Sequence, residues 1–149
     1  MSHTMKSQYF HLIWSTKNRI NWITPDIQPR LYAYIGGLIR GHNNSLLCIG
    51  GTENHVHLLI SFKNIDRFSS MMRDYKSKST IWLRDAFPHK KNFTWQIGYG
   101  AFSTSYSGLD KVMHYIENQE EHHKKISFEQ EFEMILEKHN IKMYQKENI

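Results

Sequence analysis

The first hydrophobic segment of the chain, residues 9–15, is apolar on both sides of an extended backbone. Phe10, Leu12 and Trp14 alternate with apolar residues that point the other way, and this two-sided pattern is typical of a central strand. Thr24 precedes Pro25, which is the usual order of a helix N-cap and the first helical residue. Apolar side chains then recur at helical spacing, so we expect a helix to follow.

The middle of the chain predicts a β-hairpin followed by a long helix. Residues 45–50 and 54–62 have the composition of strands, and the glycines and polar residues between them supply turn chemistry. From residue 65 to about residue 87 the apolar side chains return to helical spacing. Residues 92–105 are rich in aromatic and β-prone side chains, which favours a further strand.

Two capping signals predict two helices toward the C-terminus. Ser107 and Asp110 have the spacing of a capping box, with Asp in the place of the usual Glu, for a helix that runs to about residue 123. Ser127 and Gln130 form a second such pair ahead of a helix with an apolar face. The predicted order is therefore β-α-β-β-α-β followed by two helices.

This order describes an α+β fold, the ferredoxin-like plait, in which an antiparallel sheet of four strands carries helices on one face. The chain has 149 residues, 40% of them hydrophobic and 22% charged, which fits a single domain over residues 1–149 with a flexible tail at about 141–149. It lacks the run of roughly 18 apolar residues that a membrane span needs. Cys48 is the single cysteine, which excludes an internal disulfide and a cysteine metal cage, so we expect a cytoplasmic protein without a membrane partner.

Positive charge is concentrated in the middle of the chain. The net charge is +5, and residues 63–91 carry eight basic against three acidic side chains, whereas residues 110–149 carry six against nine. A basic segment beside an acidic one favours a polyanion partner, most commonly nucleic acid, although a solvated helix face has the same composition. The candidate DNA contacts in this segment are Lys63, Arg67, Arg73, Lys76, Lys78 and Arg84.

Two groups of polar residues have the spacing that chemistry requires. His55 and His57 lie two residues apart on one face of a predicted strand, where both imidazoles can reach one divalent cation or can be present by coincidence. Tyr115, Gln119 and His122 follow one another at helical spacing, which can equally describe a solvated helix face. A cation held by the two histidines and an amide oxygen would polarise a phosphate.

Four segments together resemble one protein family. They read YFHLIWSTK at residues 9–17, ENHVHLLI at 53–60, WQIGYGAFS at 95–103 and YIENQEEHH at 115–123. In their order and spacing they look like the small single-tyrosine HUH transposases of bacterial insertion sequences, where HUH denotes two histidines around one hydrophobic residue. The resemblance covers nearly the whole chain.

The resemblance implies a site and a reaction. His55 and His57 match the pair that holds a catalytic Mg²⁺ or Mn²⁺, and Gln119 matches the third protein ligand, although the position of His122 also permits ligation. Tyr115 matches the nucleophile, which attacks single-stranded DNA and gives a 5′-phosphotyrosine link and a free 3′-hydroxyl. Of the eight tyrosines, it alone has a potential metal ligand one helical turn away. Such proteins recognise hairpins near element ends and work as homodimers, in many of which the tyrosine helix completes the partner's active site.

One departure from the family pattern lies next to the first histidine. Glu53 and Asn54 precede His55 where an Asp often stands, which affects only the groups around the metal ligands. Trp95 and Tyr99 belong to one of the matching segments and are expected to pack in the core rather than to stack on bases.

Two other functions are compatible with the same sequence. A domesticated nickase that cleaves hairpin or repeat DNA would share every site residue with a transposase. A non-catalytic ferredoxin-like module that binds nucleic acid would need only the basic helix, and its histidines would be incidental. The sequence favours the transposase over both.

Overall fold

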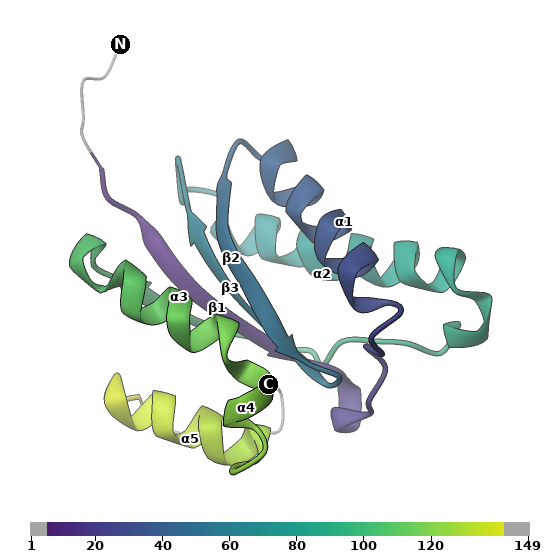
Figure 1. Ribbon diagram of the computed structural model, residues 1–149. Coiled ribbons are helices and arrows are strands. Elements are labelled where there is room, and N and C mark those ends of the chain that lie inside the picture. Colours follow the sequence, from purple (N-terminus) through teal and green to yellow (C-terminus); the bar gives the residue numbers. More distant parts are fainter. Residues whose placement is uncertain (1–5, 142–149) are drawn as a thin grey trace.

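Four strands form one antiparallel sheet in the computed structural model, which describes residues 6–141 (Figure 1). The strands are β1 (Tyr9–Ser15), β2 (Ser45–Thr52), β3 (His55–Ser61) and β4 (Gly100–Thr104). Their order across the sheet is β2-β3-β1-β4, and each neighbouring pair is antiparallel. This is the strand order of a ferredoxin-like plait, so the predicted α+β fold class is confirmed.

Helices cover both faces of this sheet. On one face lie α1 (Gln28–Gly41) and α2 (Phe68–Ala86), and on the other lie α3 (Leu109–Glu117), α4 (Gln119–His122) and α5 (Phe128–Lys138) (Figure 1). The two helices of the plait therefore share one face, as predicted, and the helices that follow β4 add a third layer.

Alternation along the central strands divides their side chains between two cores. Leu12 and Trp14 of β1 pack with Leu58 of β3 in the core beneath α1 and α2, whereas Ile13 belongs to a second core on the opposite face. All four side chains are fully buried. The two-sided apolar pattern of residues 9–15 follows from this covering of both faces.

The second core attaches α5 to the sheet. Phe128, Phe132 and Leu136 come from α5 and pack with Ile13 of β1 and Phe102 of β4. These five buried side chains hold α5 over two neighbouring strands, although it follows them far along the chain.

The two capping signals toward the C-terminus have different outcomes. Ser127 forms the predicted capping box with Gln130, because the side chain of each accepts a hydrogen bond from the backbone N–H of the other. Ser107 caps no helix, because a short 3₁₀ turn over Tyr106–Gly108 takes up this residue and α3 begins after it. The predicted box with Asp110 is therefore wrong.

The first helix begins later than predicted. The backbone N–H groups of Ile27 and Gln28 both donate to the carbonyl oxygen of Thr24, so a turn precedes α1. Pro29, rather than Pro25, occupies the first turn of the helix. The signal at Thr24 thus marks the turn and not the helix itself.

The β-prone segment 92–105 contributes less to the sheet than expected. Only Gly100–Thr104 form a strand there, and Trp95 adds a single antiparallel bridge to Thr16. The glycines that interrupt the segment are consistent with this shortening.

The predicted helix up to about residue 123 is broken in the middle. Asn118 leaves helical geometry and separates α3 from α4. Gln119, the first residue of α4, is buried with an exposed fraction of 1%. The break therefore directs an amide side chain toward the sheet one turn after Tyr115.

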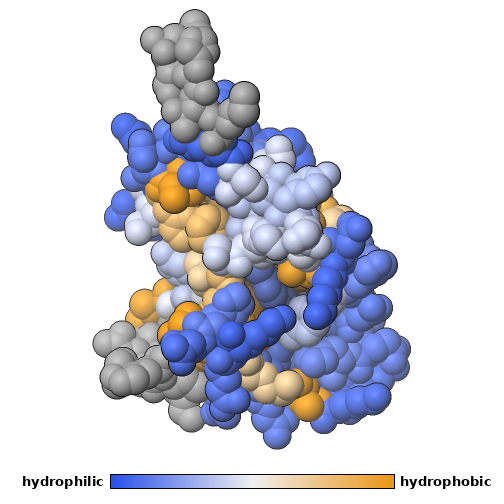
Figure 2. Space-filling model, turned by 90° about the vertical axis from the view of Figure 1, so that its left-hand side faces the viewer, coloured by the Kyte–Doolittle hydropathy of each residue, from blue (hydrophilic) through white to orange (hydrophobic). Residues whose placement is uncertain are grey.

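Most of the surface in Figure 2 is hydrophilic, and its apolar side chains form separate patches. Ile97, Tyr106 and Met134, which are exposed, belong to different parts of the described chain. Within residues 6–141, no helix combines the length and the hydropathy needed to cross a membrane. The predicted flexible tail lies outside the described residues, apart from residue 141.

The third layer lies in close contact with the sheet at Gly50 of β2. A Cβ atom on this residue would lie 2.3 Å from the carbonyl oxygen of Ile116 in α3, so only glycine permits the contact. Because Ile116 follows Tyr115 directly, this contact sets how deeply the tyrosine helix rests on the sheet.

We expect Gly50→Ala to push α3 away from β2 and to lower the free energy of unfolding by about 1–3 kcal/mol, the usual cost of overpacking a core. Gly41→Ala is the matched control, because no atom lies within 4 Å of the position that its Cβ would occupy. It should change the free energy of unfolding by less than about 1 kcal/mol. Urea unfolding measures both variants, and equal stabilities would contradict the role given to Gly50.

Candidate active site

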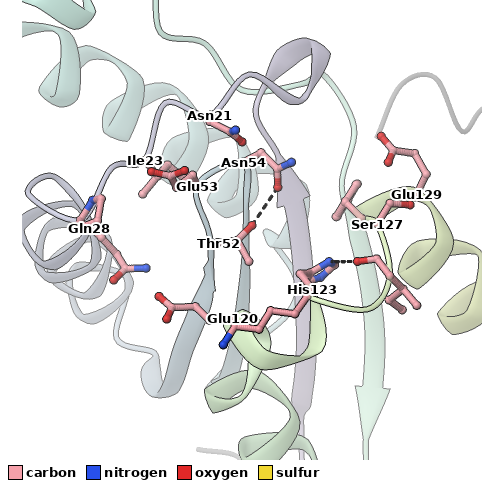
Figure 3. Close-up of a pocket in the computed structure, with 14 residues that line it drawn as sticks. Asn21, Ile23, Gln28, Thr52, Glu53, Asn54, Glu120, His123, Ser127 and Glu129 are labelled. Carbon is pink, nitrogen blue, oxygen red and sulfur yellow. Dashed lines mark hydrogen bonds between the residues drawn. The ribbon is translucent and has the colours of Figure 1, made fainter.

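A pocket of about 510 Å³ opens at the tip of the β2–β3 hairpin (Figure 3). Thr52, Glu53 and Asn54 line it from the hairpin, and His123 lines it from the end of α4. Behind this opening, between the sheet and the helices α3, α4 and α5, lies a buried cluster of polar side chains to which His123 also belongs.

β3 carries the two predicted metal-binding histidines on the face covered by the third layer. His55 and His57 are separated by Val56, which points into the opposite core, so both imidazoles project from the same face. Both side chains have an exposed fraction of 0%. Their ring centroids are 5.1 Å apart, and the prediction that the two rings share one face is confirmed.

The surroundings of His55 direct one ring nitrogen at oxygen atoms. Its Nδ1 lies 2.8 Å from Oδ1 of Asn54 and donates to it, whereas its Nε2 lies 3.0 Å from Oε1 of Gln119 and 3.5 Å from Oε1 of Glu131. Burial and the neighbouring His57 lower the pKa of His55 to about 3, so the ring is neutral at neutral pH. An unprotonated ring nitrogen that faces oxygen acceptors is the arrangement of a metal ligand.

His57 is oriented by a further buried histidine, His11 of β1. The Nε2 of His11 lies 2.8 Å from the Nδ1 of His57, and the two rings stack with centroids 5.0 Å apart. The other nitrogen of His57, Nε2, lies 3.0 Å from Oε1 of Glu131. Burial, and then the neighbouring His57, lower the pKa of His11 to about 3, so this ring is also neutral. His11 was not predicted to belong to the site, and it lies there because β1 and β3 are neighbours in the sheet.

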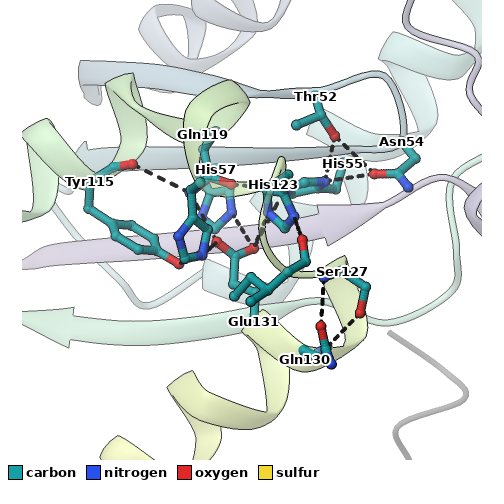
Figure 4. Close-up of polar contacts among 12 residues, drawn as sticks. Thr52, Asn54, His55, His57, Tyr115, Gln119, His123, Ser127, Gln130 and Glu131 are labelled. Carbon is teal, nitrogen blue, oxygen red and sulfur yellow. Dashed lines mark hydrogen bonds and ion pairs between the residues drawn. The ribbon is translucent and has the colours of Figure 1, made fainter.

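The interrupted helix places Tyr115 and Gln119 beside these histidines (Figure 4). The ring of Tyr115 lies 5.7 Å from that of His57, and its hydroxyl donates a hydrogen bond to Oε2 of Glu131. Gln119 donates from Nε2 to the same oxygen at 3.0 Å. Nε2 of His122, the alternative ligand, lies 3.3 Å from the tyrosine oxygen. The fold thus brings together the tyrosine, the histidine pair and both candidates for the third ligand.

Glu131 of α5 lies at the centre of the cluster and was not predicted. Its carboxylate is 1% exposed, and Oε1 lies 3.1 Å from Nε2 of His123, another residue that was not predicted. A signal for Glu131 was present in the sequence. It lies three residues after Phe128 and directly before Phe132, on the apolar face of an amphipathic helix, where an acidic side chain is unexpected.

The charge of the cluster is concentrated on this one carboxylate. Burial alone would raise the pKa of Glu131, but hydrogen bonds from His123 and His57 hold it well below its usual range, so the group is ionised. Burial, and then the charge of Glu131, raise the pKa of Tyr115 far above its usual value, so its side chain is a neutral phenol. A divalent cation would offset both the buried charge and the cost of forming a phenolate.

Four side chains of the cluster have the chemistry of a metal site. The ligand atoms of His55, His57, His123 and Glu131 all lie within 4.8 Å of one another. No second group of three or more such side chains comes together within the part of the chain that the structure describes.

Lys76, one of the six candidate DNA contacts, is bonded within the fold. Its ammonium donates to the backbone carbonyl oxygens of Gln96, Ile97 and Gly98 at 2.7–2.8 Å, which occupies all three of its donors. Burial lowers its pKa to about 8. Lys76 therefore fixes the segment that leads into β4.

The other five candidate DNA contacts are exposed. Arg67 and Arg73 line a shared groove at the start of α2, together with Ser69 and Ser70. Some of the five also make contacts within the fold, such as the hydrogen bond from Nε of Arg84 to a backbone carbonyl oxygen at 2.7 Å. The exposed residues are Lys63, Arg67, Arg73, Lys78 and Arg84.

The two aromatic residues expected in the core are found there. Trp95 is 5% exposed, its Nε1 donates to Oγ of Ser79 at 2.9 Å, and its ring meets that of Trp14 edge-on. Tyr99 is partly buried against the same core, beside Phe68. The predicted packing role is therefore confirmed.

Comparisons with known proteins agree with this fold. The family profile described as "Transposase IS200 like" matches residues 4–119. A crystal structure from Deinococcus radiodurans R1, described as that of a transposase, is 22% identical with a TM-score of 0.67 and covers 80% of this chain and 95% of its own. The structure of a REP-associated tyrosine transposase bound to a REP hairpin is 19% identical with a TM-score of 0.57, covering 78% of this chain and 68% of its own. No curated protein matches at a significant level.

The fold and the site define an α+β plait that carries a histidine pair and a tyrosine helix on one face. Because the family profile spans residues 4–119, which is most of the sequence, the chain belongs to the family of IS200-like transposases. The matched segment contains the histidine pair and Tyr115 and ends at Gln119. His123 and Glu131 follow it.

We expect Lys76→Met to lower the free energy of unfolding by about 2 kcal/mol, because it leaves three backbone carbonyl oxygens without their charged donor. Lys78→Met is the control on the same helix, since Lys78 is exposed and pairs with Asp74 at 3.5 Å on the surface. Its loss should cost less than about 1 kcal/mol. The measurement is urea unfolding followed by tryptophan fluorescence, and an equal loss in both variants would refute the role of Lys76.

Proposed function

We propose that this IS200-like transposase cleaves and rejoins single-stranded DNA by attack of Tyr115 on a phosphodiester, through a 5′-phosphotyrosine intermediate. The observation that carries the proposal is that the tyrosine hydroxyl and the imidazoles of His55 and His57 converge on one buried carboxylate (Figure 4). A phenol beside a pair of buried histidines supports nucleophilic attack assisted by a metal ion. Membership of the family supports DNA as the substrate.

The residues of the site fit a divalent metal ion, Mg²⁺ or Mn²⁺. The fit rests on donor chemistry, because His55 directs an unprotonated nitrogen at the amide oxygen of Gln119, and His57 projects from the same strand face. These two imidazoles and the amide oxygen would hold the ion. When bound, the ion polarises the scissile phosphate and stabilises charge on the leaving oxygen.

Tyr115 and its neighbours supply the covalent step. The phenolic oxygen forms a bond to phosphorus while the bond between phosphorus and the 3′ oxygen breaks. The phenol proton passes toward Oε2 of Glu131, which already accepts the hydrogen bond of the hydroxyl, and the leaving 3′ oxygen takes a proton from solvent water. Rejoining is the reverse step, in which a 3′-hydroxyl attacks the phosphotyrosine and releases Tyr115 without a need for ATP.

The DNA partner in this proposal is single-stranded DNA with hairpin ends. Support comes from a protein of similar fold whose structure is bound to a REP hairpin. The exposed basic residues on and beside α2 would contact phosphates and supply affinity rather than sequence selectivity. Lys76 is the exception among them, since its ammonium is already bonded to backbone oxygens.

A nickase that acts on chromosomal repeats is the second candidate function. The same REP-bound structure favours it, and it would use the same site residues on different DNA. A non-catalytic binding module is disfavoured, because DNA binding alone gives no reason to bury an ionised Glu131 among several histidines.

We expect Tyr115→Phe to reduce the covalent protein–DNA adduct by at least ~1000-fold while the binding of hairpin DNA is unchanged, since only the attacking oxygen is lost. The adduct is measured by denaturing electrophoresis with a labelled single strand and Mn²⁺. Tyr106→Phe is the matched control, because Tyr106 is 75% exposed and should retain full activity. An adduct that forms at a near-normal rate in Tyr115→Phe would overturn the proposed mechanism.

A homodimer with shared sites stays a prediction, and the fold supports a site that is complete within one chain. α3 rests on β2 and β3 of its own sheet, and the ring of Tyr115 lies 5.7 Å from that of His57 in the same chain. We therefore propose that the tyrosine acts on DNA held by its own histidines.

Mixing Tyr115→Phe protein with His55→Ala protein separates the two arrangements. If each chain is complete, the mixture should cleave no more DNA than the two variants measured alone, because neither chain holds both the nucleophile and the metal ligands. Strand cleavage is followed on a labelled hairpin substrate after co-refolding, which allows exchange of subunits. A clear recovery of cleavage in the mixture would establish sites shared between subunits.

A further inference from the structure

The two oxygens of the Glu131 carboxylate face different partners. Oε1 lies 3.0 Å from Nε2 of His57, 3.1 Å from Nε2 of His123 and 3.5 Å from Nε2 of His55. Oε2 accepts the hydrogen bond of the Tyr115 hydroxyl. Oε2 also lies 3.3 Å from Nε2 of His122 and accepts a hydrogen bond from Gln119 at 3.0 Å. Oε1 is therefore directed at the imidazoles of His55, His57 and His123, and Oε2 at the group that contains the candidate nucleophile.

We infer that His123 and Glu131 complete the metal centre, so that three imidazoles and one carboxylate hold the ion together with the amide oxygen of Gln119 and favour a first-row transition metal over Mg²⁺. Both residues follow the segment, residues 4–119, that matches the family profile. The catalytic use of this centre rests on the proposed function, whereas its binding of metal can be tested separately.

In both His55 and His123, the Nδ1 atom is hydrogen-bonded to an oxygen, which leaves Nε2 to act as the metal ligand. The Nδ1 of His123 lies 2.9 Å from the carbonyl oxygen of Ile126, and the Nδ1 of His55 lies 2.8 Å from Oδ1 of Asn54. Each Nδ1 thus donates its hydrogen to an oxygen, which leaves Nε2 directed at Oε1 of Glu131. Either a proton or a metal ion between such a nitrogen and the carboxylate balances the contact, and fixed second nitrogens of this kind are usual in metal-binding histidines.

The distances within the cluster allow one ion to reach all four groups. The ligand atoms of His55, His57, His123 and Glu131 lie within 4.8 Å of one another, close to twice a metal–ligand bond of about 2.1 Å. The arrangement needs only a small contraction to close on an ion.

The donor set decides which ion is preferred. Mg²⁺ takes oxygen ligands and keeps several waters, whereas imidazole nitrogen is a good ligand for first-row transition metals. His55 and His57 are fully buried and Glu131 is 1% exposed, which leaves little room for a shell of waters. Mn²⁺ is the transition metal used to test the site, because it has a solution signal that is lost on binding.

The test is a titration of the full-length protein with Mn²⁺, in which the EPR signal of free Mn²⁺ reports binding. We expect one bound ion per chain that a 100-fold excess of Mg²⁺ does not displace. Glu131→Gln and His123→Asn should each raise the Kd for Mn²⁺ by at least ~10-fold. Circular dichroism and urea unfolding establish that each variant is folded, and His123→Asn keeps the test decisive if Glu131→Gln fails to fold.

The controls are Glu137→Gln on the same helix and His114→Asn on α3, both exposed, which should leave the Kd within ~2-fold of the wild type. A folded Glu131→Gln or His123→Asn variant with unchanged or tighter Mn²⁺ binding would overturn the inference, and so would displacement of Mn²⁺ by Mg²⁺. Tyr115→Phe should bind Mn²⁺ normally. A wild-type protein that binds Mn²⁺ in this manner but forms no DNA adduct would refute the proposed function and leave the metal centre standing.

Discussion

The network of the Glu131 carboxylate is the interaction on which the geometry of the site depends. An ionised group at 1% exposure is stable only when it is fully hydrogen-bonded, and its partners come from β3, α3, α4 and the turn after α4. The aromatic side chains of α5 pack against the sheet and fix the helix there. This packing places the Glu131 carboxylate beside the histidines of β3. A helix beyond the family-matched segment thereby determines the relative positions of His57 and Tyr115.

The spacing of residues within single strands and helices was sufficient to predict four members of this site, namely His55, His57, Tyr115 and Gln119. Alternation along a strand places His55 and His57 on one face whatever lies above them, and the fold confirms that placement. Helical spacing likewise puts Gln119 one turn after Tyr115. Helical spacing did not predict the break at Asn118. The position of the break depends on how α3 and α4 contact β2, and the spacing of residues within one helix carries no information about contacts with a distant strand.

The remaining residues depend on tertiary packing between elements that are distant in sequence. His11 reaches His57 only because β1 lies beside β3, and Glu131 reaches both strand histidines only because α5 folds back over the sheet. The acidic residue on an apolar helix face was the one local signal. Asn54 shows how a departure from the family pattern is accommodated, because its amide oxygen accepts a hydrogen bond from the histidine that follows it.

Charge balance connects this packing with the proposed chemistry. The rings of His55 and His11 are neutral and Glu131 is ionised, so the centre of the cluster is negative unless a cation is present. Burial lowers the pKa of His123, but the hydrogen bond and charge of Glu131 outweigh it and raise that pKa, so a proton on His123 can serve as the cation. A bound phosphodiester would add a second negative charge beside the Glu131 carboxylate. It would also lie next to Tyr115, whose raised pKa keeps its phenol neutral. In the proposed reaction, a single proton would offset only the charge already present, so close approach of DNA to Tyr115 would require a more highly charged cation in the same place.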